Sequence, residues 1–240
     1  MKNIYKVLLI ILFGFVSSAD AIAEHKGKHK VDKFWVAAND GTDKVWHDSA
    51  NWSKKSGGKG GGGTPNSKRH NAVFDSNSTV NVKLEGNVGT IFKLKVLNGY
   101  SGTINLNGKD LKTQYNMLIN SGTVLVPANS TFQSYRDLYI GTNGTVTASG
   151  DGNVIIVRNN LKIYGALKAP SGGSDRFFVR GGFNIFSGGY FDHSDGTVTF
   201  NTRYNNGKKG SCKNKPTAAI NIVDGPGVGR NFYNVTKTAK

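Results

Sequence analysis

The chain has very little cysteine and few acidic residues, and beyond its N-terminal region it has no long apolar run. Cys212 is the only cysteine in 240 residues, which excludes a framework of intramolecular disulfides. Stability must therefore come from burial and hydrogen bonding. No segment after the N-terminal region reaches the roughly 20 apolar residues that a spanning helix needs, so we expect no membrane span in the mature protein.

The shortage of carboxylates argues against hydrolytic catalysis. Glycoside hydrolysis needs two carboxylates on either side of the scissile bond, but the aspartates here are scattered and mostly adjoin turn residues. They are Asp110, Asp137, Asp151, Asp175, Asp192, Asp195 and Asp224. His193 lies between two of them, yet residues at that spacing do not converge on one point. The glycine run 60–63 lacks the Gly-Lys-Ser/Thr ending of a P-loop. We predict no catalytic residues, metal or cofactor; a polysaccharide lyase or hydrolase is the main enzymatic alternative.

The first residues have the pattern of a secretory signal peptide. Lys2 and Lys6 precede an apolar stretch at residues 7–16, and Ala-x-Ala sites follow at residues 19–21 and 21–23. We therefore predict that residues 1–23 are a signal peptide, and that the protein is secreted or displayed on the cell surface.

Basic residues outnumber acidic ones by 31 to 15, giving a formal net charge of +16. Outside the cytoplasm this charge favours anionic partners, such as cell-surface polymers, acidic glycans or extracellular DNA. Lysines concentrate in an N-terminal arm, in a loop that contains Lys54 and Lys55, and near Lys208 and Lys209. These four lysines are candidate binding residues for such a polymer.

Composition divides the rest of the chain into three parts. Residues 24–33 are polar and basic and predict a flexible arm. Residues 34–79 form a predicted N-terminal cap region, with a glycine-rich stretch at residues 53–66 that we expect to be a flexible loop. Residues 80–240 contain short alternating apolar and polar runs separated by Gly, Asn, Asp and Ser, which indicate strands and turns.

A repeated unit, Gly followed by an apolar-polar alternation, begins at Gly102, Gly122, Gly144, Gly165 and Gly189, at steps of 20, 22, 21 and 24 residues. Such a period predicts an all-β fold, a single-stranded parallel β-helix (β-solenoid) with about 20–24 residues per coil. Its inward side chains should stack in one column, namely Ile104, Val124, Val146, Leu167 and Phe191. The alternative fold is an antiparallel β-sandwich.

Two further series complete three strands per coil. One contains residues 110–111, 137–140, 160–163 and 182–185, and the other contains residues 116–119, 131–134, 154–157 and 177–179. Gly and Asn recur between these runs because tight corners need backbone conformations with positive φ.

Trp35, Trp46 and Trp52 allow two interpretations. Their rings could stack on sugars as part of a glycan-binding site, or they could form an aromatic cap over the N-terminal end of the solenoid core, which is the interpretation we favour.

The segment from Val45 to Ser53, which contains Trp46 and Asn51-Trp52, is followed by Pro65 and by Ala72-Val73-Phe74-Asp75. This pattern resembles the opening of secreted bacterial β-helix surface proteins of the autotransporter-passenger-like and β-strand-repeat kinds. The resemblance implies a structural or adhesive surface or extracellular-matrix module. Alternatives are a secreted glycan-binding or carbohydrate-active protein and a cationic binder of envelope polymers or extracellular DNA.

The C-terminal segments 218–223 and 231–235 are apolar. They can close the solenoid as a last strand, or they can pair with another copy to build an oligomer or a fibre.

Overall fold

The computed structural model describes residues 29–172, 176–201, 220–222 and 234–238. The predicted signal peptide, residues 24–28 of the predicted arm, Lys208, Lys209 and Cys212 lie outside these ranges. Within them, the chain forms strands and one short 3-10 turn, η1 (Ser49–Asn51).

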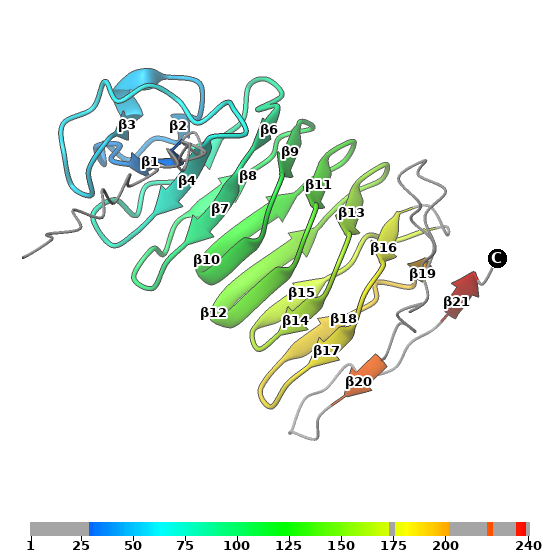
Figure 1. Ribbon diagram of the computed structural model, residues 1–240. Helices are drawn as coiled ribbons and strands as arrows, with labels where there is room; N and C mark the ends of the chain where they lie inside the picture. Colours follow the sequence, from blue (N-terminus) through cyan, green and yellow to red (C-terminus); the bar gives the residue numbers. More distant parts are fainter. Residues whose placement is uncertain (1–28, 173–175, 202–219, 223–233, 239–240) are drawn as a thin grey trace, which may run out of the picture.

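The protein is a parallel β-solenoid of about six turns, as the repeat predicted (Figure 1). Each coil between residues 70 and 201 contributes one strand to each of three faces. The long strands β10 (Met117–Val126) and β12 (Leu138–Ala148) each bend from the first face into the second. All pairings between coils are parallel, which excludes the antiparallel sandwich.

The strands of each face follow one another along the solenoid. The first face also contains β1 (Val31–Trp35), β4 (His70–Phe74), β7 (Lys93–Val96), β14 (Leu161–Ile163), β17 (Phe183–Ile185) and β20 (Ile220–Ile222). The second also contains β2 (Lys44–Val45), β5 (Val82–Lys83), β8 (Thr103–Asn105), β15 (Ala166–Lys168) and β18 (Tyr190–Asp192). The third contains β6 (Thr90–Ile91), β9 (Asp110–Thr113), β11 (Thr131–Ser134), β13 (Val154–Val157), β16 (Phe177–Val179), β19 (Thr197–Asn201) and β21 (Asn234–Thr238).

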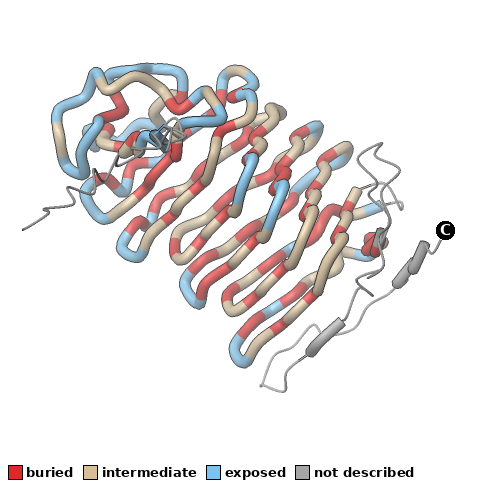
Figure 2. Tube along the Cα trace, in the orientation of Figure 1, coloured by how far each residue is buried: buried red, intermediate tan, exposed pale blue. Residues whose placement is uncertain are grey.

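The predicted inward column is confirmed. Ile104, Val124, Val146, Leu167 and Phe191 are partners in register across successive coils, and Val82 extends the column by one coil. All six side chains are at most 1% exposed. Figure 2 shows the alternation of buried and more exposed positions along the strands. The apolar side chains therefore stack on their own equivalents, and each coil buries the one before it.

The assignment of two sequence series was partly wrong. Residues 110–111 belong to β9 on the third face, where Leu111 pairs with Phe132, whereas residues 117–119 belong to β10 on the first face, where Met117 pairs with Leu138. The first members of the two series must therefore be exchanged. Corners of different length separate the strands, so spacing alone could not decide which run lies on which face.

Regular structure begins earlier than the composition indicated. Strand β1 starts at Val31 and pairs in parallel with β4, so residues 31–33 of the predicted flexible arm are part of the sheet. Lys33 points inward at this end, is 7% exposed, and donates a hydrogen bond from Nζ to the carbonyl oxygen of Gly62. Coils also begin before residue 80, since β4, β5 and β6 form a complete one.

The glycine-rich stretch is a packed loop, in contrast to the flexible loop expected. Gly61 and Gly62 donate backbone hydrogen bonds to the carbonyls of Ser49 and Trp52. A Cβ on Gly60 would lie 1.8 Å from the carbonyl oxygen of Ala50, and one on Gly62 would lie 2.6 Å from the backbone of Ser53. Glycine here permits close backbone approach to β3 (Trp52–Ser53), which pairs antiparallel with β1 and covers the first edge of the sheet.

The corners use the residues that the sequence indicated. Asn107 and Asn129 have φ of 50° and 59°, and Gly108 and Gly150 have φ of 75° and 74°, all in the left-handed region. At the other end, β20 pairs with β17 and β21 pairs with β19, both in parallel. Parts of both apolar C-terminal segments therefore add strands to their own chain.

Substitution of Gly144 tests the close stacking of coils. A Cβ at this position would lie 1.9 Å from the carbonyl oxygen of Ile119 in the preceding coil. We expect Gly144→Ala to lower the free energy of unfolding by about 1–3 kcal/mol through overpacking. Gly86→Ala is the matched control, because its Cβ would meet nothing closer than 3.5 Å; it should leave stability unchanged or slightly raised. Equal melting temperatures for the two variants in thermal denaturation would contradict this packing.

Candidate functional site

The three tryptophans lie in the core at the N-terminal end of the solenoid. Trp35, Trp46 and Trp52 are each 0% exposed, and their rings pack on one another with centroids 4.8–5.1 Å apart. Each indole N–H donates to a backbone carbonyl, namely those of Val80, Pro65 and Trp46. Phe74 packs against all three rings and also against Tyr100. None of the indoles offers a face to a ligand from solvent.

Lys54 and Lys55 are exposed on the loop that follows β3. The charge of Lys54 acts on buried Lys33, whose pKa is lowered from the usual value first by burial and then by this neighbouring cation. Lys54 and Lys55 are thus surface cations at the N-terminal end of the solenoid, and within the described ranges no aromatic ring lies under their ammonium groups.

A groove lies elsewhere, on the outer surface of the first face. It encloses about 280 Å³ and crosses β7, β10, β12 and β14. Three successive coils each supply two of its outward side chains and the fourth supplies one. Those that line it are Lys93, Lys95, Asn116, Leu118, Asp137, Tyr139 and Lys162.

A ladder of side-chain amides and one carboxylate fixes the edge of this groove. The Oδ1 of Asn116 accepts from the backbone N–H of Asp137 at 3.3 Å, and the Oδ1 of Asp137 accepts from the N–H of Asn160 at 3.0 Å. The Oδ1 of Asn160 in turn accepts from the N–H of Gly182 at 2.9 Å. Asp137 also accepts from Nδ2 of Asn159 at 2.7 Å. This carboxylate is therefore held in place by two donors, and it organises the corner between the third and first faces.

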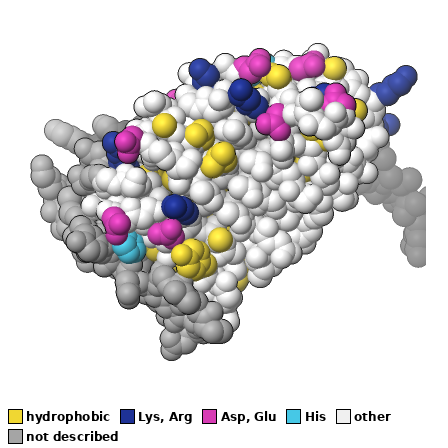
Figure 3. Space-filling view, turned by 180° about the vertical axis from the view of Figure 1, so that it is seen from behind, with side chains coloured by type: hydrophobic (Ala, Val, Ile, Leu, Met, Phe, Trp, Pro, Cys, Tyr) yellow, Lys and Arg dark blue, Asp and Glu magenta, His cyan; other side chains and the backbone are white. Residues whose placement is uncertain are grey.

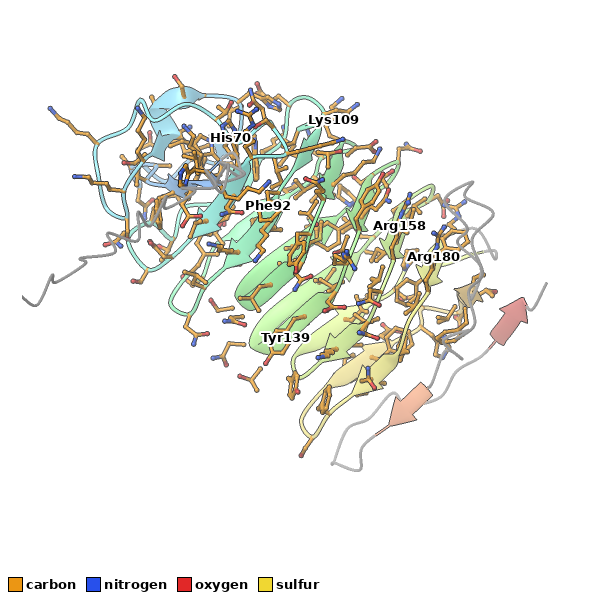
Figure 4. All side chains as sticks on the ribbon, in the orientation of Figure 1. His70, Phe92, Lys109, Tyr139, Arg158 and Arg180 are labelled. Atoms are coloured by element: carbon orange, nitrogen blue, oxygen red, sulfur yellow. The ribbon has the colours of Figure 1, made fainter. Side chains whose placement is uncertain are left out.

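That corner carries aromatic rings paired with cations. Phe92 and Tyr115 stack with centroids 5.4 Å apart, and Lys93 lies 4.7 Å from the Tyr115 centroid. The guanidinium of Arg158 lies 4.0 Å from the ring centroid of Tyr135. Figure 4 shows Phe92 and Arg158 along one edge of the solenoid, with Tyr139 on the face beside it. Tyr115 and Tyr135 are both 39% exposed, so their rings reach solvent.

A second aromatic cluster starts in the groove itself and continues along the later coils. Tyr139, which lies in one column with Lys95 and Lys162, packs against Tyr164 at 5.1 Å, and Tyr164 stacks on Phe186 at 4.1 Å with an interplanar angle of 2°. Tyr164 and Phe186 follow β14 and β17, at the corner between the first and second faces.

The groove lysines are mostly not neutralised. Ion pairs in the described ranges join Lys95 to Asp32, Lys44 to Asp40, Lys112 to Asp110 and Lys168 to Asp192. Among those same residues, Lys93 and Lys162 have no carboxylate within ion-pairing distance. The opposite side differs, since Figure 3 shows basic and acidic side chains interspersed there. The lining holds three lysines and the carboxylate of Asp137, and Lys95 is paired with Asp32, so the groove keeps a small excess of positive charge beside exposed aromatic rings.

The residues around His193 form a turn. Asp192 accepts from the backbone N–H of Ser194, and Nδ1 of His193 accepts from that of Asp195. In the part of the chain that the structure describes, no three His, Cys, Asp or Glu side chains gather as metal ligands would.

Comparison with known proteins returned no match to a family model, to a curated protein or to a solved structure. The resemblance to secreted bacterial β-helix surface proteins therefore stays a prediction. Among the described residues, no helix is long and apolar enough to cross a membrane.

The groove residues were not singled out from the sequence. The signal was present, however, because Lys95, Tyr139 and Lys162 each stand between two apolar residues of a repeated strand, which is the outward position. An alignment of the outward positions of successive coils would have identified these residues as one row.

The N-terminal end should respond to pH through His70. Its pKa is lowered from the usual value by burial first, and then by the charges of Lys33 and Arg69; its Nδ1 accepts from the backbone N–H of Asn66. Because the unfolded chain binds the proton more readily, stability should fall as pH drops below about 6.5. We expect the melting temperature to fall less between pH 8 and pH 5.5 in His70→Gln than in wild type. An identical loss in both proteins would rule out this contribution.

Proposed function

We propose that this protein is an exported, non-enzymatic adhesive module of β-solenoid architecture that binds an anionic polymer along its first face. The observation that carries the proposal is the groove that runs across four coils, with Lys93 and Lys162 free of ion pairs among the described residues and the ring of Tyr139 on a strand between theirs. Export and surface location rest on the predicted signal peptide.

The shape of the site supports an extended ligand. The lining side chains come from the same strand position in successive coils, so they follow the solenoid axis instead of converging on one point. A polymer lying along this axis would meet one row of side chains per coil, about every 4.8 Å. Lysines beside the half-buried ring of Tyr139 suit charged and hydroxylated polymers, since an aromatic face packs on an apolar sugar face and lysines neutralise acidic groups.

The chemistry within the groove supports binding over catalysis. Asp137 is the one carboxylate among the residues that line it, and its Oδ1 is engaged by Asn159 and by the backbone N–H of Asn160. A pair of carboxylates flanking a bond is what most glycoside hydrolases use. Lysines, an amide and apolar side chains make up the rest of the lining.

Binding to an acidic polysaccharide tests this function. We expect purified protein to be retained on a heparin resin and to be released by salt, because exposed charges are screened. The double variant Lys93→Gln/Lys162→Gln should weaken the Kd for heparin about tenfold and reduce its dependence on salt concentration.

The control removes the same charge elsewhere. Lys83 lies on the second face and Lys109 at the corner between the second and third faces. The double variant Lys83→Gln/Lys109→Gln should bind heparin with a Kd within about twofold of wild type. Equal weakening by the two double variants would show that net charge alone governs binding and that the first face is not the site.

A further inference from the structure

We infer that the polymer recognised by the first face is an acidic glycan whose charged sugars are separated by uncharged ones. This inference rests on the proposed function and adds the charge pattern of the ligand. The geometry points to it because the cations of the groove stand at its two ends, while its middle carries none.

The four coils supply rows of outward side chains in strict register. Strand β7 supplies Lys93 and also Lys95, whose charge is paired with Asp32, and strand β14 supplies Lys162. Between them, Lys95 is the partner of Leu118, Leu118 of Tyr139, and Tyr139 of Lys162. Since neighbouring strands lie about 4.8 Å apart, the two ends of this column are about 14 Å apart.

The middle of the groove suits an uncharged, hydroxylated unit. Leu118 and Tyr139 are half-buried and form an apolar floor on which a sugar ring can lie. At the edge beside them stand Asn116 and Asp137, whose remaining lone pairs can accept from sugar hydroxyls. An anionic group held here would lose water against an apolar surface and would also face the carboxylate of Asp137.

This pattern disfavours nucleic acid and uniformly charged glycans. A single strand carries a phosphate on every nucleotide, so phosphates would fall over the rows of Leu118 and Tyr139, where the groove lining offers no cation. Ring faces at the neighbouring corner are already in use: Lys30 lies 4.0 Å from the centroid of Phe92, whose other neighbour is Tyr115. Stacking of bases between these rings would have to displace existing contacts.

Two oligosaccharides of equal length test the inference. One alternates a single uronate with two uncharged N-acetylated hexosamines, which matches the two uncharged rows between the lysine rows, and the other is an oligogalacturonate with a carboxylate on every ring. Measured by calorimetry at physiological salt, we expect the alternating one to bind at least about fivefold more tightly, because no charged group is then left unpaired over the floor. An oligodeoxythymidylate of similar length should bind more weakly than the alternating glycan.

The variant Leu118→Lys places a cation in the middle of the groove. It should strengthen the binding of oligogalacturonate more than that of the alternating glycan. The ratio of the two affinities should therefore fall, or reverse in favour of oligogalacturonate. Thr147→Lys is the matched control, because it adds the same charge at an outward position of the second face. It should leave the ratio of the two affinities unchanged.

The outcomes separate the two proposals. Equal affinity for both glycans, tighter binding of the oligodeoxythymidylate, or no binding of either glycan would overturn the charge pattern inferred. If Lys93→Gln/Lys162→Gln nevertheless weakens heparin binding selectively, the proposed function stands without it. If that variant binds heparin as the control does, the first face is not the binding site and both proposals fail.

Discussion

Everything else in this protein depends on the in-register parallel pairing of one coil with the next. The pairing satisfies backbone N–H and C=O groups between coils, and it also places each inward side chain on its own equivalent, as in the column from Val82 to Phe191. The same register holds on the outside. Because of this register, polar and aromatic residues at outward positions also form rows along the solenoid. The groove on the first face is a direct product of that register.

The same constraint explains where the structure needs special residues. Corners must turn within a few residues while the neighbouring coil lies directly against them, so they use glycine where a Cβ would strike a carbonyl, as at Gly144 and Gly165. They use asparagine where a side-chain oxygen can reach the backbone of the next coil, as at Asn116 and Asn160. In the described part of the chain, no coil precedes the one that contains β1 and β2. Three buried tryptophans, the antiparallel strand β3 and the packed glycine-rich loop take the place of a preceding coil.

The sequence predicted the solenoid and its inward column because both produce a regular repeat, and such a repeat can be detected from the amino-acid sequence alone. It did not predict which run lies on which face, since residues 110–111 and 117–119 are distinguished only by the lengths of the corners around them. The glycine-rich stretch was interpreted as flexible because its composition indicates many accessible backbone conformations. Composition does not show which other segments pack against that backbone. The groove was missed because its lysines are no more frequent than others in a chain of +16; only the register shows that Lys93 and Lys162 lie along one face.

Register also gives a reason why a strongly cationic protein can be selective. A net charge of +16 attracts any polyanion, and attraction at long range is not sensitive to pattern. Discrimination among polyanions requires positions at which an anionic group binds poorly. The groove positions contributed by β10, β12 and the corners before them are of this kind: Asn116, Leu118, Asp137 and Tyr139. In the binding mode that we propose, the lysines on either side are fixed points about three coils apart, so the spacing of the coils would set the spacing of acidic groups that the first face prefers.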